Sequence, residues 1–205
     1  RARDLANFAD GSIELPTASG GTYTISGTNT STNRSVVLPD EAGTVLTSAS
    51  DIQSQALGSV PVFRANRTST QSLTHNTVTK VQFNSEIVDT DGCYDPTTNY
   101  RFTPTTAGYY QLSFSFNING HVKNWSGSGF IYKNGSRILR IVDGEQSGWD
   151  ETNFSGTIIV EANGTTDYFE VYAYHFNYTN NGALDLVGTS DGSSFTFQGH
   201  FLRGL

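Results

Sequence analysis

The chain has 205 residues, enough for one or two domains, and its 13 Phe and 10 Tyr supply large side chains for a core. Its formal net charge of −7 and its lack of a basic cluster argue against nucleic acid, because proteins that grip phosphate backbones carry a basic face. With Cys93 as its single cysteine, the chain cannot form an intrachain disulfide, and no apolar run is long enough for membrane insertion. Because the sequence begins with Arg1 rather than Met, we also expect an upstream segment.

Residues 1–58 form the first region, and Phe8 and Tyr23 are its only aromatic residues. Short strands are predicted at Ser12–Leu15, Thr22–Ser26 and Ser35–Leu38, and a short helix at Ser48–Gln55. A segment with this few apolar residues can scarcely bury a core alone. The segment is therefore either flexible or completed by copies of itself. We predict a β-rich stalk or base over residues 1–58, with residues 10–47 intertwined or side by side in three chains, and a second domain over residues 59–205.

From Val60 onward the sequence is aromatic and strand-like. Apolar and polar residues alternate in Tyr110–Phe116 and Phe195–Phe201, as in strands with one buried face. The expected strands are Val62–Asn66, Thr77–Ile87, Tyr100–Thr103, Gly108–Ile118, Gly129–Lys133, Arg137–Val142, Asn153–Glu161, Tyr168–Asn177 and Ser194–Arg203. Asn-Gly pairs at 134–135 and 163–164 predict tight hairpins. About ten strands at this spacing indicate an all-β sandwich or jelly roll.

The order of short motifs in this second region resembles the C1q/TNF-like jelly rolls. The motifs are Phe63-Arg64-Ala65, Val81-Gln82-Phe83-Asn84, Tyr94-Asp95-Pro96, Phe102-Thr103-Pro104, Ala107-Gly108-Tyr109-Tyr110, Tyr132-Lys133-Asn134-Gly135, Gly156 to Val160, Tyr168-Phe169-Glu170-Val171 and Ser194 to Leu202. The resemblance implies a ten-stranded jelly roll that forms compact homotrimers. No Gly-X-Y repeat precedes the domain, so the collagen-like stalk of many such proteins is missing.

The first region resembles a different class of protein. Residues 36–47, VVLPDEAGTVLT, are similar to segments in tail-fibre and other virion proteins of bacteriophages, and residues 3–11, RDLANFADG, also look like such proteins. This second resemblance implies a viral structural protein, located on the virion, in which a fibrous base carries a C1q-like head.

No residue pattern indicates an enzyme or a cofactor. None of the four histidines, His200 included, lies in a recognisable catalytic motif, and Cys93 lacks a nucleophile signature. Acidic residues in loops offer oxygen ligands for calcium, but their spacing matches no EF-hand, and solvated acidic turns are the favoured interpretation. These residues are Asp89, Asp91, Asp143, Asp150, Asp185 and Asp191.

The two tryptophans, Trp125 and Trp149, stand in Gly/Ser-rich loops. Each indole either closes the end of the core or contacts a ligand, and the sequence leaves both open. In the ligand interpretation, the rings stack on a sugar while Asp143, Asp150 and Glu151 accept its hydroxyl hydrogen bonds. This candidate site favours a host surface glycan, such as lipopolysaccharide, over a protein receptor.

We therefore expect a homotrimeric virion protein, a tail fibre or a capsid fibre, which contacts other virion proteins through residues 1–58 and binds the host surface through its head. The trimer is also expected because six aromatic residues cannot all share one inner sheet face, so that some should line an interface. These are Tyr109, Phe114, Phe116, Phe176, Phe197 and Phe201. The alternatives are a capsid-cementing trimer without receptor binding and a secreted C1q-like recognition protein. A depolymerase is disfavoured because no pair of carboxylates stands out.

Overall fold

A computed structural model of the chain describes residues 12–16, 22–26, 60–119, 122–146, 151–189 and 195–205. This part of the chain consists of strands and loops, and it holds no helix that is long and apolar enough to span a membrane. The chain divides into two compact units, residues 1–47 and 48–205. In the first unit, β1 (Ser12–Pro16) pairs antiparallel with β2 (Thr22–Ser26). The strand expected at 35–38 and the helix expected at 48–55 lie outside the described residues.

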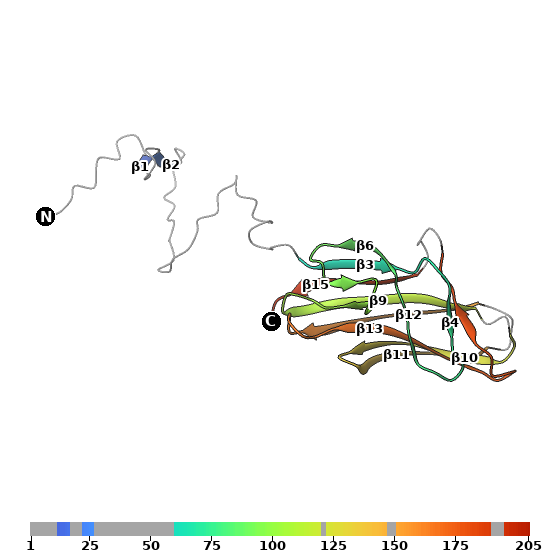
Figure 1. The fold of residues 1–205 in the computed structure, drawn as a ribbon. Coiled ribbons are helices and arrows are strands. Elements are labelled where there is room, and N and C mark those ends of the chain that lie inside the picture. The colour runs from blue at the N-terminus through green and yellow to red at the C-terminus, as the bar shows by residue number, and fades with distance from the viewer. Residues whose placement is uncertain (1–11, 17–21, 27–59, 120–121, 147–150, 190–194) are drawn as a thin grey trace, which may run out of the picture. The chain divides into compact units, whose positions relative to one another are not determined.

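The second unit is a jelly roll of two antiparallel sheets (Figure 1). The larger sheet runs in the order β4 (Gln71–Leu73), β14 (Leu184–Leu186), β9 (Gly108–Asn119), β15 (Thr196–Arg203), β3 (Val62–Asn66) and β6 (Ser85–Asp89), with β12 (Glu151–Ala162) on the other edge of β9. The smaller sheet runs in the order β11 (Ser136–Gln146), β10 (Trp125–Lys133), β13 (Phe169–Asn177), β8 (Arg101–Phe102) and β7 (Tyr94–Asp95), and β5 (Thr79–Lys80) also pairs with β13. The all-β jelly roll expected from the sequence is thus confirmed.

The core lies between the two sheets and is built from alternate residues of their strands. On β9, Tyr110, Leu112, Phe114, Phe116 and Ile118 are all buried, while the residues between them, up to Ser115, are partly exposed. This period of two is what a strand with one buried face requires. The alternation in the sequence therefore predicted both the strand and its inward face.

The six aromatic residues singled out in the sequence do not all share one inner face, as expected. Phe114, Phe116 and Phe197 are at most 2% exposed and belong to one core cluster, and Phe201 packs against the same cluster. The facing sheet accommodates them because glycines leave room: a Cβ on Gly129 would lie 2.7 Å from Phe114. These four side chains therefore belong to the core, whereas Tyr109 on β9 and Phe176 on β13 are partly exposed, and their place in an interface stays a prediction.

The two Asn-Gly turns have different roles. Asn134 and Gly135 both have positive φ and join β10 to β11 in the expected tight hairpin. The hairpin expected at Asn163-Gly164 is wrong, because β12 pairs with β9 while β13 pairs with β10, so this turn crosses between the sheets. The long strand expected at Thr77–Ile87 is likewise divided into β5 and β6.

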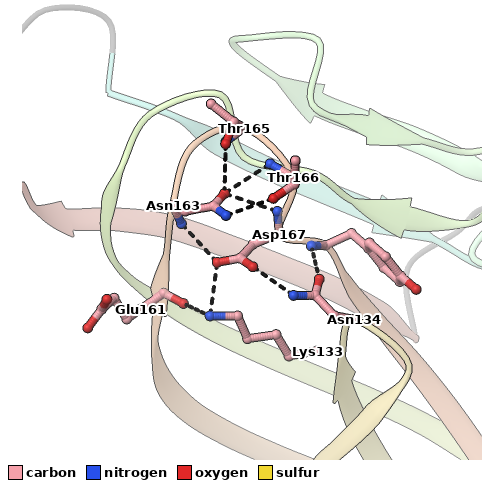
Figure 2. Close-up of polar contacts among 8 residues, drawn as sticks. Lys133, Asn134, Glu161, Asn163, Thr165, Thr166 and Asp167 are labelled. Carbon is pink, nitrogen blue, oxygen red and sulfur yellow. Dashed lines mark hydrogen bonds and ion pairs between the residues drawn. The ribbon is translucent and has the colours of Figure 1, made fainter.

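A buried carboxylate clamps the crossing turn to the hairpin (Figure 2). Asp167 pairs with Lys133 Nζ at 2.9 Å and accepts hydrogen bonds from Asn134 Nδ2 at 2.7 Å and from the Asn163 N–H at 2.9 Å. Asn163 Oδ1 in turn accepts the N–H groups of Thr165, Thr166 and Asp167. Burial alone would raise the pKa of Asp167, but the bonds from Asn134, Lys133 and Asn163 hold that pKa below its usual value. The clamp therefore depends on an ionised Asp167.

Strand pairing places both ends of the jelly roll at one end of the sandwich. His200 near the C-terminus lies opposite Val62 at the start of β3, and Arg203 lies opposite Tyr109 near the start of β9. The opposite end holds Asn119 at the close of β9 and the beginning of β12. Below, this second end is called the distal end.

Candidate functional site

Trp125, the first of the expected ligand-binding residues, lies at the distal end but inside the core. It begins β10 between Asn177 of β13 and Gln146 of β11, and its relative exposure is 0%. An enclosed indole has no free face on which a sugar ring can stack. The position of Trp125 is that of an indole that closes the end of the core, which is one of the two interpretations that the sequence left open.

The other expected ligand residues are only partly described. Glu151 begins β12 as an exposed residue, and its two carboxylate oxygens accept hydrogen bonds from Asn117 Nδ2 at 3.0 Å and Asn119 Nδ2 at 3.2 Å. Asp143 lies in β11 opposite Gly127, and its side chain lies outside the described part of the structure, as do Trp149 and Asp150. The fold therefore brings Trp125 and Glu151 to one end of the sandwich, but the described residues do not form a site there.

A second candidate surface is the outward side of the larger sheet, where β3, β15 and β9 lie next to one another. A hollow of about 300 Å³ opens on this side. It is lined by Val62, Phe63, Arg64, Val88, Gln111, Ser113, Gln198, Gly199 and His200. Four of these lining residues alternate with the buried residues of β9 and β15: Gln111, Ser113, Gln198 and His200. This alternation was the sequence signal for the surface.

The hollow combines apolar, amide, hydroxyl and basic groups, and no carboxylate lines it. A catalytic role would need a nucleophile or a positioned acid and base, and the lining offers only one imidazole, that of His200. Such a mixed lining suits contact with another protein surface. We name it the sheet hollow.

Two further groups weighed in the sequence have structural partners. Asp89, one of the acidic loop residues, accepts the N–H of Tyr94 at 2.7 Å and that of Asp91 at 3.2 Å, so it shapes the turn after β6. Burial, and then the nearby Asp89, raise the pKa of the Cys93 thiol, which makes it a poor nucleophile at neutral pH. Within the described ranges, no group of three or more His, Cys, Asp and Glu side chains is placed to hold a metal ion.

Comparison with known families identifies the fold. The C1q domain family matches residues 62–202, which is most of the chain. The chain belongs to the C1q domain family. C1q and TNF domains are typically trimeric and act in recognition or binding rather than catalysis. The expected C1q/TNF resemblance is thus confirmed.

One solved structure agrees with this C1q domain assignment at the level of the fold, and a second is similar at a lower score. Murine APRIL at pH 5.0 matches with a TM-score of 0.50 and 11% identity, over 70% of this chain and 99% of that one. The Eiger TNF from S. frugiperda matches with a TM-score of 0.46 and 10% identity, over 71% of this chain and 93% of that one. A search of curated protein sequences finds no match. None of these matches concerns a virion, so the bacteriophage resemblance of residues 1–58 stays a prediction.

Proposed function

We propose that this chain is a homotrimeric bacteriophage virion protein, a tail fibre or capsid fibre, whose C1q head binds the host cell surface. The observation that carries the proposal is a C1q domain over residues 62–202, in a family that acts in recognition. The similarity of residues 3–11 and 36–47 to virion proteins supports the viral setting. In this proposal residues 1–58 attach the head to other virion proteins.

The larger sheet is the proposed assembly surface. Ile159 on β12 is 61% exposed and lies opposite Gln111, so it stands on the same side of the sheet as the sheet hollow. Val88, 41% exposed, lines the far side of that hollow. In a closed ring each copy sets one patch against a different patch of its neighbour. The β12 side of one copy, with Ile159, would cover the sheet hollow of the next.

The position of the chain ends supports the direction of presentation. The jelly roll begins at Val62 and closes at Arg203 at one end of the sandwich, so the chain enters and leaves the head at that end. The distal end and the outward side of the smaller sheet then face away from the virion and from the three-fold axis. Three such copies would raise a weak single-site affinity through avidity.

The decisive experiment has two parts. The purified chain, fluorescently labelled, is incubated with a panel of bacterial cells, and the parent particle is imaged by electron microscopy with an antibody against this chain. Specific binding to one group of cells and label on a fibre are expected. Label on the capsid without any cell binding would indicate the capsid-cementing alternative, and a cellular gene with a secretion signal would indicate a secreted recognition protein.

A further inference from the structure

The outward side of the smaller sheet carries a row of aromatic side chains. On β13, Val171, Ala173 and His175 are buried in the core, so the alternate residues Tyr172, Tyr174 and Phe176 lie on the opposite side. On the neighbouring strand β10, Phe130 lies opposite Tyr172 and Tyr132 lies opposite Glu170, which places both on that same side. These five residues, Phe130, Tyr132, Tyr172, Tyr174 and Phe176, are named the aromatic face.

The rings of the aromatic face are held in place by contacts with one another and by their hydroxyl groups. The rings of Tyr132 and Tyr172 lie 4.4 Å apart, and Phe176 lies 4.5 Å from His75 and 4.7 Å from Tyr178. Two hydroxyl groups are also bonded: Tyr174 donates to Asn76 Oδ1 at 2.8 Å and Tyr172 donates to Glu170 Oε2 at 3.1 Å. Rings fixed in this way lose little entropy when a ligand binds.

The aromatic face is also open enough to be reached. Tyr132, Tyr172, Tyr174 and Phe176 are partly exposed, and Tyr178 beyond the end of β13 is 51% exposed. Phe130 is only 3% exposed, so it supports the side chains of Arg137 and Arg140 rather than contacting a ligand itself. At about 3.3 Å per residue, the row from Tyr172 to Tyr178 extends for about 20 Å. This length suits an extended polymer better than a small compact ligand.

Basic side chains surround these rings. The guanidinium carbons of Arg137 and Arg140 lie 5.6 and 5.9 Å from the ring of Phe130, and Lys80 Nζ lies 5.9 Å from the ring of Tyr172. Arg101 lies 4.4 Å from the ring of Tyr168 nearby. The carboxylates that the structure describes on this side of the sheet include Glu170, which is paired with Lys80, and Asp95, which lies opposite Arg101 and accepts the N–H groups of Thr98 and Asn99. The face is thus locally positive on a chain of net charge −7.

We propose that the aromatic face binds an acidic polysaccharide. The ring faces stack on the apolar faces of the sugars, and Arg137, Arg140 and Arg101 hold the carboxylate or sulfate groups. A neutral glycan would leave the arginines unused. A nucleic acid carries a charge on every nucleotide, and the net negative charge of the rest of the chain opposes its binding. The inference rests on the proposed host-binding function, for which it names the class of surface polymer.

The proposed ligand is tested first with defined polymers. Full-length protein is passed over immobilised dextran sulfate, polygalacturonate and neutral dextran, and equilibrium binding is measured at two salt concentrations. Binding to both acidic polymers is expected, weaker in high salt, with about tenfold weaker binding to neutral dextran. Equal binding to neutral dextran, or tighter binding to a single-stranded dT oligonucleotide than to dextran sulfate, would overturn the inference.

Two matched pairs of variants locate the site. Tyr174→Ala and Tyr174→Phe both lose the hydrogen bond to Asn76, but only Ala loses the ring; we expect about fivefold weaker binding for Ala and almost no change for Phe. Arg140→Gln and Arg203→Gln change the net charge equally, but Arg203 is an exposed residue of β15 in the larger sheet; only Arg140→Gln should weaken binding. Equal loss in both members of either pair would contradict a site on this face.

Whole bacterial cells separate this inference from the host-binding proposal. Binding of the chain to cells should fall with Tyr174→Ala and with added dextran sulfate. Cell binding that both treatments leave unchanged would overturn the acidic polysaccharide and leave the host-binding function standing. Retained binding to the acidic polymers with no binding to any cell would overturn the host-binding function alone.

Discussion

Trp125 offers a direct test of where the core of this C1q domain ends. The indole is fully enclosed at the distal end, and a Cβ on Gly127 would lie 3.0 Å from its Cζ3 atom. Packing this close leaves no room for a neighbouring side chain to move in when the ring is removed. Trp125→Ala should therefore leave a cavity.

The size of the loss follows from the buried area. A fully buried aromatic side chain removes about 200 Å² from water, which at about 25 cal/mol per Å² corresponds to about 5 kcal/mol. Buried Trp→Ala substitutions cost about 3–5 kcal/mol. Since 1 kcal/mol shifts the melting temperature of a domain of this size by about 2–4 °C, we expect Trp125→Ala to lower it by about 10–15 °C.

The assay is thermal unfolding followed by circular dichroism, with cell binding measured well below the midpoint of the variant. Trp125→Phe is the control, because it keeps a buried ring and should lose less than half as much. Cell binding per folded molecule should stay unchanged in both variants. An unchanged midpoint for Trp125→Ala together with lost cell binding would refute the reasoning, since it would make the indole a receptor contact.

Three further substitutions test the assembly surface, the clamp and the buried histidine. Ile159→Glu should convert the trimer to monomers in light scattering. Val142→Glu on the smaller sheet is the control, because Val142 is 59% exposed and Ile159 is 61% exposed, and it should leave the trimer intact. Equal effects of the two substitutions would contradict the assembly surface. Asp167→Asn should lower the free energy of unfolding by about 1–3 kcal/mol at pH 7. The folded state lowers the pKa of Asp167, so the ionised carboxylate stabilises the fold above the unfolded pKa of about 3.9, and this stabilisation is lost as the pH falls below that value. The free energy of unfolding of Asp167→Asn should therefore decrease less on acidification than that of the unsubstituted chain. Burial also lowers the pKa of His175, whose Nε2 donates to the Leu73 carbonyl at 2.9 Å. Below the unfolded pKa of about 6.5 the unfolded chain takes up a proton that the folded chain does not, so the free energy of unfolding should decrease there. His175→Gln should flatten the curve between pH 7 and 5; an unaltered slope would exclude this residue as the cause.

The sequence was sufficient to predict a strand and its orientation where the strand is long and has one buried face. The alternation around Phe114 on β9 predicted both the strand and its orientation. The pair Asn134-Gly135 predicted the hairpin between β10 and β11. The same turn chemistry at Asn163 misled, because a local turn does not determine which sheet receives the next strand. Strands of two or three residues, such as β7 and β14, are too short to show a period.

The candidate surfaces were harder to predict for a related reason. Residues 171–174 are all apolar or aromatic, and nothing local distinguishes inward Val171 and Ala173 from outward Tyr172 and Tyr174. Only the layer that covers one side of the sheet makes the other side a surface. For Trp125 the flanking glycines suggested an exposed loop, whereas they are the small residues that let a strand lie against large rings.

The most direct test of the whole account is the mass of the intact chain in solution at micromolar concentration, measured by light scattering. A C1q head that assembles through its larger sheet predicts three times the 22.2 kDa of one chain. A mass of one chain, unchanged on tenfold concentration, would contradict the trimer and with it the assembly surface.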